Sequence, residues 1–258
     1  MRFGCCVSPD QIDVLARAGY DFCELPARAV LPFDDDAAAL PALSQIAAAP
    51  LRPESFNVLI PPELPMVGPR ADLVALRSYL RRAFGRMAQL GGVVAVLGSG
   101  AARRIPDGMP REQGLDQLAT ALTLAANEAS RAGIALALEH LNQGETNVFT
   151  SLAECHAFVE QRDLAGLHLL ADIYHLELEQ EPLTHVVAAG PLLAHVHVAG
   201  GGRRAPDVPG YDYTAFMAAL HATGYDRRIS AECSWEDLET QAAESLAFMR
   251  RNWEARAL

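Results

Sequence analysis

The stretch 134-IALALEHLNQGETN-147 joins a run of apolar residues to a row of polar ones. Its first five residues are small or branched and apolar, which is typical of a strand buried on both faces of a parallel sheet. Glu139 follows this run, and an ionised carboxylate at the end of a buried strand requires a cation, a hydrogen-bond donor or water. Parallel α/β proteins form their sites at such strand ends. We therefore expect a barrel organised around Glu139, which holds a divalent metal and moves a proton.

The pattern of a short apolar strand followed by a helix or a helix-length segment occurs eight times. The expected strands are residues 2–7, 21–25, 54–59, 93–97, 134–139, 167–172, 192–198 and 228–233. The expected helices are residues 8–19, 36–49, 71–90, 111–132, 151–161, 176–189 with an interruption at Pro182, 213–223 and 235–254. This alternation predicts a (β/α)8 barrel, with residues 1–258 as one domain. A doubly wound open sheet is the alternative, although no glycine-rich dinucleotide motif follows the first strand.

Composition narrows the function classes. The chain has 258 residues, 50% of them hydrophobic, and a net charge of −11. A negative chain is a poor partner for nucleic acid, whose binding depends on basic residues that displace counterions. A run of about 18 apolar residues is absent, so we expect no membrane span, and the N-terminal apolar stretch is too short for a signal peptide. The five cysteines show no CxxC spacing, which favours a reduced, cytoplasmic setting.

Potential metal ligands occupy four consecutive strand ends: Glu139, Asp172, His195 or His197, and Glu232. Strand ends converge on one mouth of a barrel, and three clustered carboxylates repel each other and take up protons unless a cation lies between them. Mostly oxygen ligands with one nitrogen favour Mn²⁺ or Mg²⁺, whereas zinc prefers more histidine or cysteine. A single such acid is more often a helix cap or an ion-pair partner. His195 and His197 share a strand face at different depths, and their spacing does not decide which one is the ligand.

Four segments carry a family resemblance: EHLNQGETN, LLADIYHLELE, HVHVAGGGRRAP and ISAEC. They resemble the motifs of the xylose isomerase-like TIM-barrel superfamily, especially those of its ketose 3-epimerases and hydroxypyruvate isomerase. The resemblance covers residues 134–235, while the first half of the chain matches only in its alternation of strands and helices. It implies an enzyme with one divalent metal, Mn²⁺ first and Mg²⁺ or Co²⁺ as alternatives.

The resemblance also implies roles for single residues. The metal ligands would be Glu139, Asp172, His197 and Glu232, and the two glutamates would also be the catalytic acid–base pair. His197 is selected over His195 because the family's substrate-binding arginine lies six residues after the ligand histidine. The implied contacts with substrate are Glu145, His175 and Arg203.

This chain departs from the family pattern in one loop. Residues 200–202 are three glycines where the family often has Asp-Ser-Asn, so the substrate contacts of this loop are expected to differ. Arg103 and Arg104 follow the fourth strand and could bind an anionic substrate or offset nearby acids.

The function expected from these observations is isomerisation or epimerisation of a small keto-sugar or keto-acid. One glutamate removes the proton beside the carbonyl, the metal stabilises the enediolate, and the other glutamate returns a proton to the opposite face. A dehydratase or lyase acting on a keto-sugar or inosose would share the first step. A non-enzymatic sugar-binding or accessory subunit is disfavoured by the two intact glutamates, and endonuclease IV by the lack of further histidine ligands and of a basic groove. A homo-oligomer is compatible with the family.

Overall fold

The computed structural model describes residues 1–255, and in it eight parallel strands close into a barrel in sequence order. The strands are β1 (Arg2–Cys6), β2 (Phe22–Pro26), β3 (Pro53–Asn57), β4 (Val94–Leu97), β5 (Ala135–Glu139), β6 (Leu167–Asp172), β7 (Leu193–Val198) and β8 (Arg228–Ala231). The ring is closed by β1 and β8, whose paired residues run from Arg2 with Arg228 to Cys5 with Ala231. The predicted (β/α)8 barrel is confirmed, and the alternative of an open sheet is wrong.

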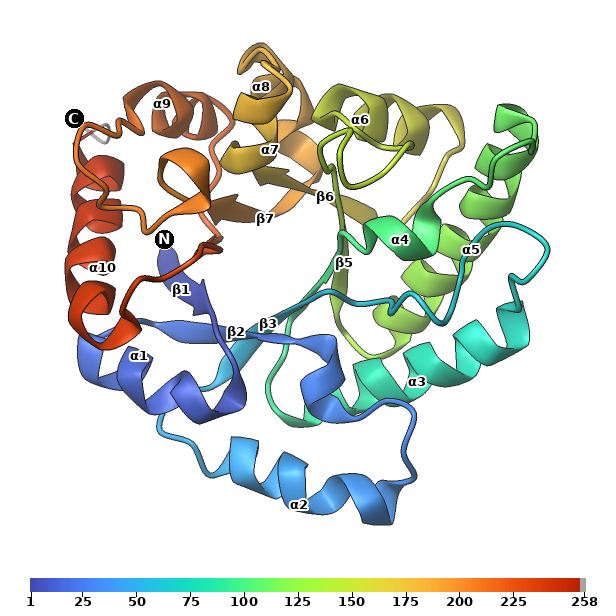
Figure 1. The fold of residues 1–258 in the computed structure, drawn as a ribbon, viewed down its shortest axis with the longest axis horizontal. Coiled ribbons are helices and arrows are strands. Elements are labelled where there is room, and N and C mark those ends of the chain that lie inside the picture. The colour runs from blue at the N-terminus through green and yellow to red at the C-terminus, as the bar shows by residue number, and fades with distance from the viewer. Residues whose placement is uncertain (256–258) are drawn as a thin grey trace.

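Helices surround the barrel on the outside (Figure 1). They are α1 (Ile12–Ala18), α2 (Asp36–Ala47), α3 (Leu73–Gln89), α5 (Arg111–Arg131), α6 (Leu152–Gln161), α7 (Ile173–Leu178), α8 (Thr184–Ala189), α9 (Thr214–Ala222) and α10 (Leu238–Glu254). The predicted interruption at Pro182 is confirmed because it separates α7 from α8. A proline inside a helix removes one backbone donor and clashes with the preceding turn.

Short helical turns lie in several loops. One α-helical turn, α4 (Gly100–Arg103), was not expected from the sequence and follows β4. The 3₁₀ turns are η1 (Pro9–Gln11), η2 (Ala27–Val30), η3 (Gly190–Leu192) and η4 (Gly201–Arg203). Each is at most four residues long, which is too short for a periodic apolar pattern to predict it.

Side-chain caps explain where several surrounding helices begin. Asp35, Asp72, Ser151 and Asp237 each accept a hydrogen bond from a backbone N–H in the first turn of the helix that follows. The first N–H groups of a helix have no partner within the helix, so such caps stabilise its start.

The apolar residues form two separate clusters. The larger one includes residues of the surrounding helices and of the strands. The smaller one joins β4 to β7 and consists of Val94, Val96, Ala137, Leu170 and Ala194. Because Ala137 and Leu170 precede Glu139 and Asp172 by two residues, they share a strand face with these acids. Apolar residues therefore underlie the strand ends at Glu139 and Asp172.

Two bulk expectations can be compared with the structure. All five cysteines are free, and Cys5, Cys23 and Cys155 are buried. Among residues 1–255, no helix combines the length and the apolar character needed to cross a bilayer.

Arg103 is fully buried, unlike the neighbouring Arg104, which is exposed. Its guanidinium donates hydrogen bonds to the backbone oxygens of Glu139 at 2.7 Å and Leu97 at 3.2 Å. The side chain thereby ties α4 to the ends of β4 and β5, beside which α4 lies in Figure 1. The interpretation of Arg103 as a ligand for an anionic substrate is wrong, because its donors face carbonyl groups inside the fold.

Replacing Arg103 by methionine tests this structural role. Arg103→Met removes the donors of three buried carbonyl oxygens, those of Leu97, Glu139 and Phe149, so we expect the free energy of unfolding to fall by about 3 kcal/mol. Urea denaturation followed by intrinsic fluorescence measures the change. Arg82→Met, an exposed arginine on α3, is the control and should leave the stability unchanged. Equal stability of the two variants would contradict the role of Arg103.

Candidate active site

Four side chains from consecutive strands meet at the carboxyl end of the barrel. Glu139 ends β5, Asp172 ends β6, His197 lies in β7, and Glu232 directly follows β8. Each offers one ligand atom, and these four atoms all lie within 4.8 Å of one another. The structure thus brings together the four residues predicted as metal ligands, while their role as ligands stays a prediction.

His197 is held by carboxylates on both ring nitrogens. Its Nδ1 atom lies 3.3 Å from Glu139 Oε1 and 3.3 Å from Glu232 Oε2. On the other side of the ring, Nε2 lies 2.9 Å from Glu24 Oε1. A carboxylate only accepts hydrogen bonds, so Nε2 carries a proton and donates a hydrogen bond to Glu24. This arrangement directs Nδ1 toward the acids, as in metal sites where a carboxylate orients the ligand histidine.

Glu24 in β2 was not singled out from the sequence. It is fully buried, and its Oε2 atom accepts hydrogen bonds from His195 Nε2 at 2.7 Å and from Ser55 Oγ at 2.7 Å. His195 therefore binds Glu24 and lies outside the group of four. Burial alone would raise the pKa of Glu24, but His197 and His195 lower it well below its ordinary value. The signal in the sequence was one acid inside the apolar strand FCELP.

The acids of the group differ in their pKa values. Burial and the carboxylates of Glu232 and Glu139 raise the pKa of Asp172 to about 8. Burial also raises the pKa of Glu139 above its ordinary value, with a contribution from Glu232. Burial acts on Glu232 too, but His197 and Arg203 lower its pKa to about 2. Without a cation, Glu232 is thus ionised, whereas Asp172 tends to hold a proton.

The donor set suits a divalent cation. Three carboxylates and one imidazole nitrogen converge, which is a set that hard or borderline ions accept. Within the described part of the chain, the Oδ2 atom of Asp172 is buried without a hydrogen-bond partner, and such an atom normally has one. A cation among the four side chains would provide that partner and relieve the repulsion that raises the pKa of Asp172.

A second group, consisting of Cys6, Glu24 and His197, is also compact enough to hold an ion. Both oxygens of Glu24 already accept hydrogen bonds. Burial, followed by the charge of Glu24, raises the pKa of the Cys6 thiol well above its ordinary value. Because a thiol binds metals as the thiolate, this second group is the poorer candidate.

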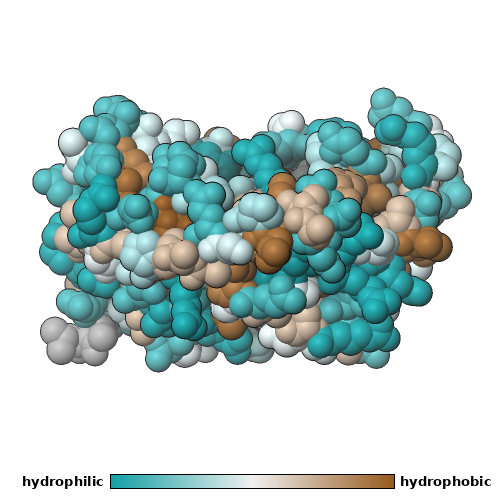
Figure 2. All heavy atoms as spheres, turned by 90° about the horizontal axis from the view of Figure 1, so that it is seen from below, coloured by the Kyte–Doolittle hydropathy of each residue, from teal (hydrophilic) through white to brown (hydrophobic). Residues whose placement is uncertain are grey.

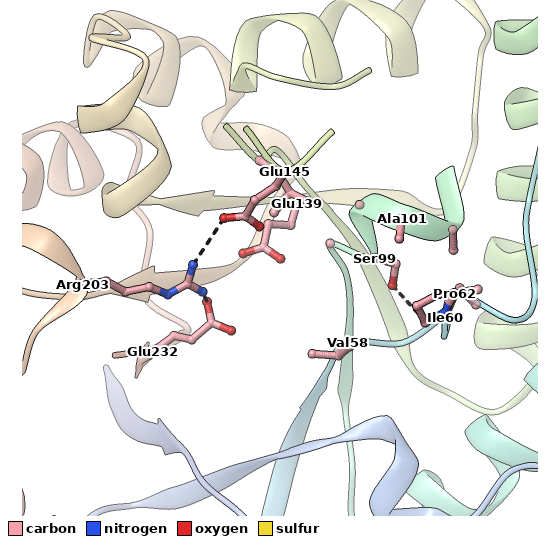
Figure 3. A pocket seen from close by; sticks show the side chains of 13 residues that line it. Val58, Ile60, Pro62, Ser99, Ala101, Glu139, Glu145, Arg203 and Glu232 are labelled. Atoms are coloured by element: carbon pink, nitrogen blue, oxygen red, sulfur yellow. Dashed lines mark hydrogen bonds and ion pairs between the residues drawn. The ribbon is translucent and has the colours of Figure 1, made fainter. Parts of the chain in front are cut away.

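A cavity of about 250 Å³, the reaction cavity, is lined by two of the four residues, Glu139 and Glu232. Its lining comprises Val58, Ile60, Pro62, residues 98–102, Glu139, Leu141, Glu145, Arg203 and Glu232. Figure 3 shows the carboxylates of Glu139 and Glu232 directed into this space from different parts of the barrel.

Arg203 connects two acids across the mouth of the cavity (Figure 3). Its Nη2 atom donates to Glu232 Oε2 at 2.6 Å, and Nη1 lies 3.7 Å from Glu145 Oε1. The guanidinium also lies over the ring of Tyr174, 4.7 Å from its centre. Arg203 and Glu145 thus both line the reaction cavity, and their contact with substrate stays a prediction.

His175 lies deeper than the cavity and is fully buried. Its Nε2 atom is 3.5 Å from Asp172 Oδ2, and its Nδ1 atom is 3.1 Å from Asn142 Nδ2. Burial and the charge of Arg203 lower the pKa of His175 to about 3, so the ring is neutral. In this arrangement His175 faces Asp172, and its contact with substrate stays a prediction.

Two further residues shape the site. Asn57 at the end of β3 donates from Nδ2 to Glu232 Oε1 at 3.1 Å, which orients that carboxylate. Gly98 follows β4, and a Cβ atom at this position would overlap with Glu139 Oε2. The glycine therefore gives the Glu139 carboxylate its space. Neither role is visible from sequence spacing, because both depend on contacts between distant strands.

The glycine loop after β7 has a backbone reason. A Cβ atom on Gly200 would overlap with the backbone oxygen of Ala205, and the N–H of Gly200 donates to Arg204 O at 2.8 Å. The loop thus folds back tightly on itself and positions Arg203 over the cavity. The expected difference in the substrate contacts of this loop stays a prediction.

Comparison with known proteins agrees with this geometry. The family model described as "Xylose isomerase-like TIM barrel" matches residues 12–252. L-ribulose 3-epimerase of Methylomonas sp. (strain DH-1) is 28% identical over 245 residues, which cover 92% of this chain and 82% of that protein. 3-Dehydro-D-guloside 4-epimerase of Escherichia coli K12 is 27% identical over 182 residues, covering 67% and 70%.

A solved structure supports the fold independently. D-psicose 3-epimerase from Clostridium cellulolyticum H10 with D-tagatose superposes with a TM-score of 0.83 at 18% identity, covering 98% of this chain and 99% of that one. With the sequence relatives, these matches confirm the prediction of an enzyme of the sugar isomerase and epimerase class. The chain belongs to the xylose isomerase-like TIM-barrel family.

Proposed function

We propose that the protein is a divalent-metal-dependent epimerase or isomerase that moves a proton at a carbon next to the carbonyl group of a keto-sugar. The observation that carries this proposal is the pair Glu139 and Glu232. Both carboxylates face the reaction cavity, both lie 3.3 Å from the same nitrogen of His197, and their pKa values are shifted in opposite directions. Opposed shifts in one site separate a proton donor from a proton acceptor.

The two glutamates divide the proton transfer between them. Glu232 is ionised and can accept a proton from the carbon, while Glu139 can hold a proton and return it. Because they enter the cavity from β5 and from the end of β8, they can act on different faces of a substrate. Arg203 can donate hydrogen bonds to a substrate oxygen, and Asn57 keeps the Glu232 carboxylate oriented.

The metal would be held by Glu139, Asp172, His197 and Glu232. When bound, it supplies positive charge that stabilises the negative charge developing on substrate oxygens as the proton leaves. Manganese as the preferred ion, residues 1–258 as one domain, a homo-oligomer and a cytoplasmic location stay predictions.

The substrate class follows from the relatives and the cavity together. One relative is named for a ketose, L-ribulose, and another for a keto-glycoside, a dehydro-guloside. Burial of Arg103 removes one candidate for binding an anionic group. We therefore place neutral keto-sugars, free or glycosidic, before keto-acids and sugar phosphates.

A substrate panel tests this function. Free ketoses, 3-keto-glycosides, hydroxypyruvate and inososes are incubated with Mn²⁺-loaded protein in heavy water, and products are identified by NMR and mass spectrometry. We expect deuterium to be incorporated at one carbon of a keto-sugar, and we expect the product to lose neither water nor another leaving group. Loss of water from the product would identify a dehydratase instead, and the absence of exchange with every compound would identify a protein that only binds sugar.

Removing either carboxylate tests the acid–base pair. Glu139→Gln and Glu232→Gln should each slow deuterium exchange by about 10²–10⁴-fold, because glutamine cannot transfer the proton. The measurement is the exchange rate by NMR, with circular dichroism to verify the fold. Glu244→Gln, an exposed acid on α10, is the control and should retain the full rate. Full exchange in either active-site variant would remove that residue from the pair.

Metal removal and its pH dependence test the ligand set. A chelator should abolish exchange, and Mn²⁺ should restore it. The pKa of Asp172 is raised to about 8 without a cation. Burial lowers the pKa of His197, but Glu24 and Glu232 raise it well above its ordinary value, so binding must displace protons below pH 8. Metal affinity, measured by calorimetry, should therefore rise by at least about tenfold per pH unit between pH 6 and 8. Activity without metal, or an affinity that is constant over this range, would contradict the assignment.

A further inference from the structure

We propose that the substrate is a keto-glycoside, and that the ring attached through its glycosidic bond lies in a second, apolar groove beside the reaction cavity. This outer groove is formed mainly by Pro32, Phe33, Val58, Pro61, Pro62 and Tyr79. The inference deepens the proposed function and rests on it, because it places the reacting keto-sugar in the reaction cavity.

The two cavities are adjacent. Val58 and Pro62 line both of them, so a group attached to a sugar in the reaction cavity lies within reach of the outer groove. The outer groove has a volume of about 500 Å³, twice the 250 Å³ of the reaction cavity. A single monosaccharide bound beside Glu139, Asp172, His197 and Glu232 would leave the larger outer groove filled with water.

The outer groove has the chemistry of a ring-binding site. Phe33 is 60% exposed, and its ring centre lies 4.9 Å from that of Tyr79. Tyr79 is buried and fixed, because its hydroxyl donates to Leu59 O at 2.8 Å. An exposed aromatic ring beside a fixed one offers an apolar face on which a sugar or aryl ring can stack. Prolines add rigid apolar walls, as is usual for small-molecule sites.

The polar residues of the groove favour a neutral ligand. Its lining includes one positive side chain, Arg28, and one negative side chain, Glu63, and both are exposed. Two opposite charges can bind the hydroxyl groups of an uncharged ring as donor and acceptor. They do not select for an ion of either sign, in contrast to the excess of acids in the reaction cavity.

Val58 at the junction is held in an unfavourable conformation. Its φ angle is 48°, in the left-handed region, which is a rare position for a β-branched residue. Its apolar side chain is nevertheless 55% exposed. The following segment is fixed by Ser99, whose hydroxyl accepts a hydrogen bond from the N–H of Ile60 at 2.9 Å. Strain that the fold maintains to present an exposed side chain is characteristic of ligand contacts.

A protein partner is the other occupant to consider. The α2 side of the molecule carries exposed apolar residues, among them Phe33 and Leu40, and Figure 2 shows apolar side chains near the middle of this face among hydrophilic ones. The outer groove itself is concave, and it borders the reaction cavity at Val58 and Pro62. These two properties favour an extension of the substrate over a partner surface.

Binding of glycosides tests the outer groove separately from catalysis. Mn²⁺-loaded protein is titrated by calorimetry with methyl glucoside and with 4-nitrophenyl glucoside, neither of which carries a ketone. We expect 4-nitrophenyl glucoside to bind at least about tenfold more tightly, because its second ring stacks on Phe33. Phe33→Ala should reduce this preference to less than about threefold. Equal affinities in the unmodified protein, or an unchanged preference in Phe33→Ala, would overturn the proposal.

Two further variants sharpen the test. Val58→Asn introduces a residue type that tolerates left-handed backbone. The variant should therefore fold with an unchanged melting temperature and lose the preference for 4-nitrophenyl glucoside. Leu40→Ala, which is 61% exposed on α2 outside the groove, should retain both the preference and the exchange rate. A dimer that becomes monomeric in Phe33→Ala, as measured by light scattering, would assign the groove to a second copy of the chain and overturn the proposal.

Deuterium exchange with the matching 3-keto-glycosides separates the two proposals. If a free ketose exchanges deuterium but neither keto-glycoside does, the proposed function stands and the keto-glycoside proposal fails. If neither the free ketoses nor the keto-glycosides exchange deuterium, the proposed function fails, whatever binds in the outer groove. If both exchange with equal KM, the proposed function stands and the outer groove fails. Exchange with a KM at least about tenfold lower for the 4-nitrophenyl compound supports both.

Discussion

The carboxylate of Glu24, buried inside the barrel, is the contact on which the candidate site depends. A buried charge is tolerated only where it is paired and hydrogen-bonded, and Glu24 accepts from His195, His197 and Ser55. By accepting the hydrogen bond from the Nε2–H group of His197, it leaves Nδ1 directed toward the acids at the strand ends. The interior of the barrel therefore determines which nitrogen is available for a metal.

The charges above Glu24 are arranged so that the site is incomplete without a cation. Glu139, Asp172 and Glu232 lie close together, and mutual repulsion combined with burial raises the pKa of two of them. Arg203 compensates part of the negative charge but binds from the cavity side. Ala137 and Leu170 lie on the same strand face below Glu139 and Asp172, and their apolar side chains offer these two acids no hydrogen bond.

The mouth of the barrel differs from its interior in backbone conformation. Val58, Ser99 and Arg203 all line the reaction cavity, and all three have φ angles in the left-handed region. The strands beneath them are regular, with register shifts only between β2 and β3 and between β6 and β7. Such a division is expected when a rigid scaffold supports loops that contact the ligand. The width of the mouth, and with it the size of the substrate, is thus a property of the loops.

The sequence by itself determined the barrel and the polar end of its strands. Alternation of apolar strands with helices is a local pattern, and so is the step from an apolar run to an acid at Glu139 and Asp172. The structure decided what depends on contacts between distant residues. Glu24 and His197 are 173 positions apart, and Arg103 is buried while its neighbour Arg104 is exposed. No local pattern carries such differences, because burial and pairing are set by the closure of the ring and by the path of each loop.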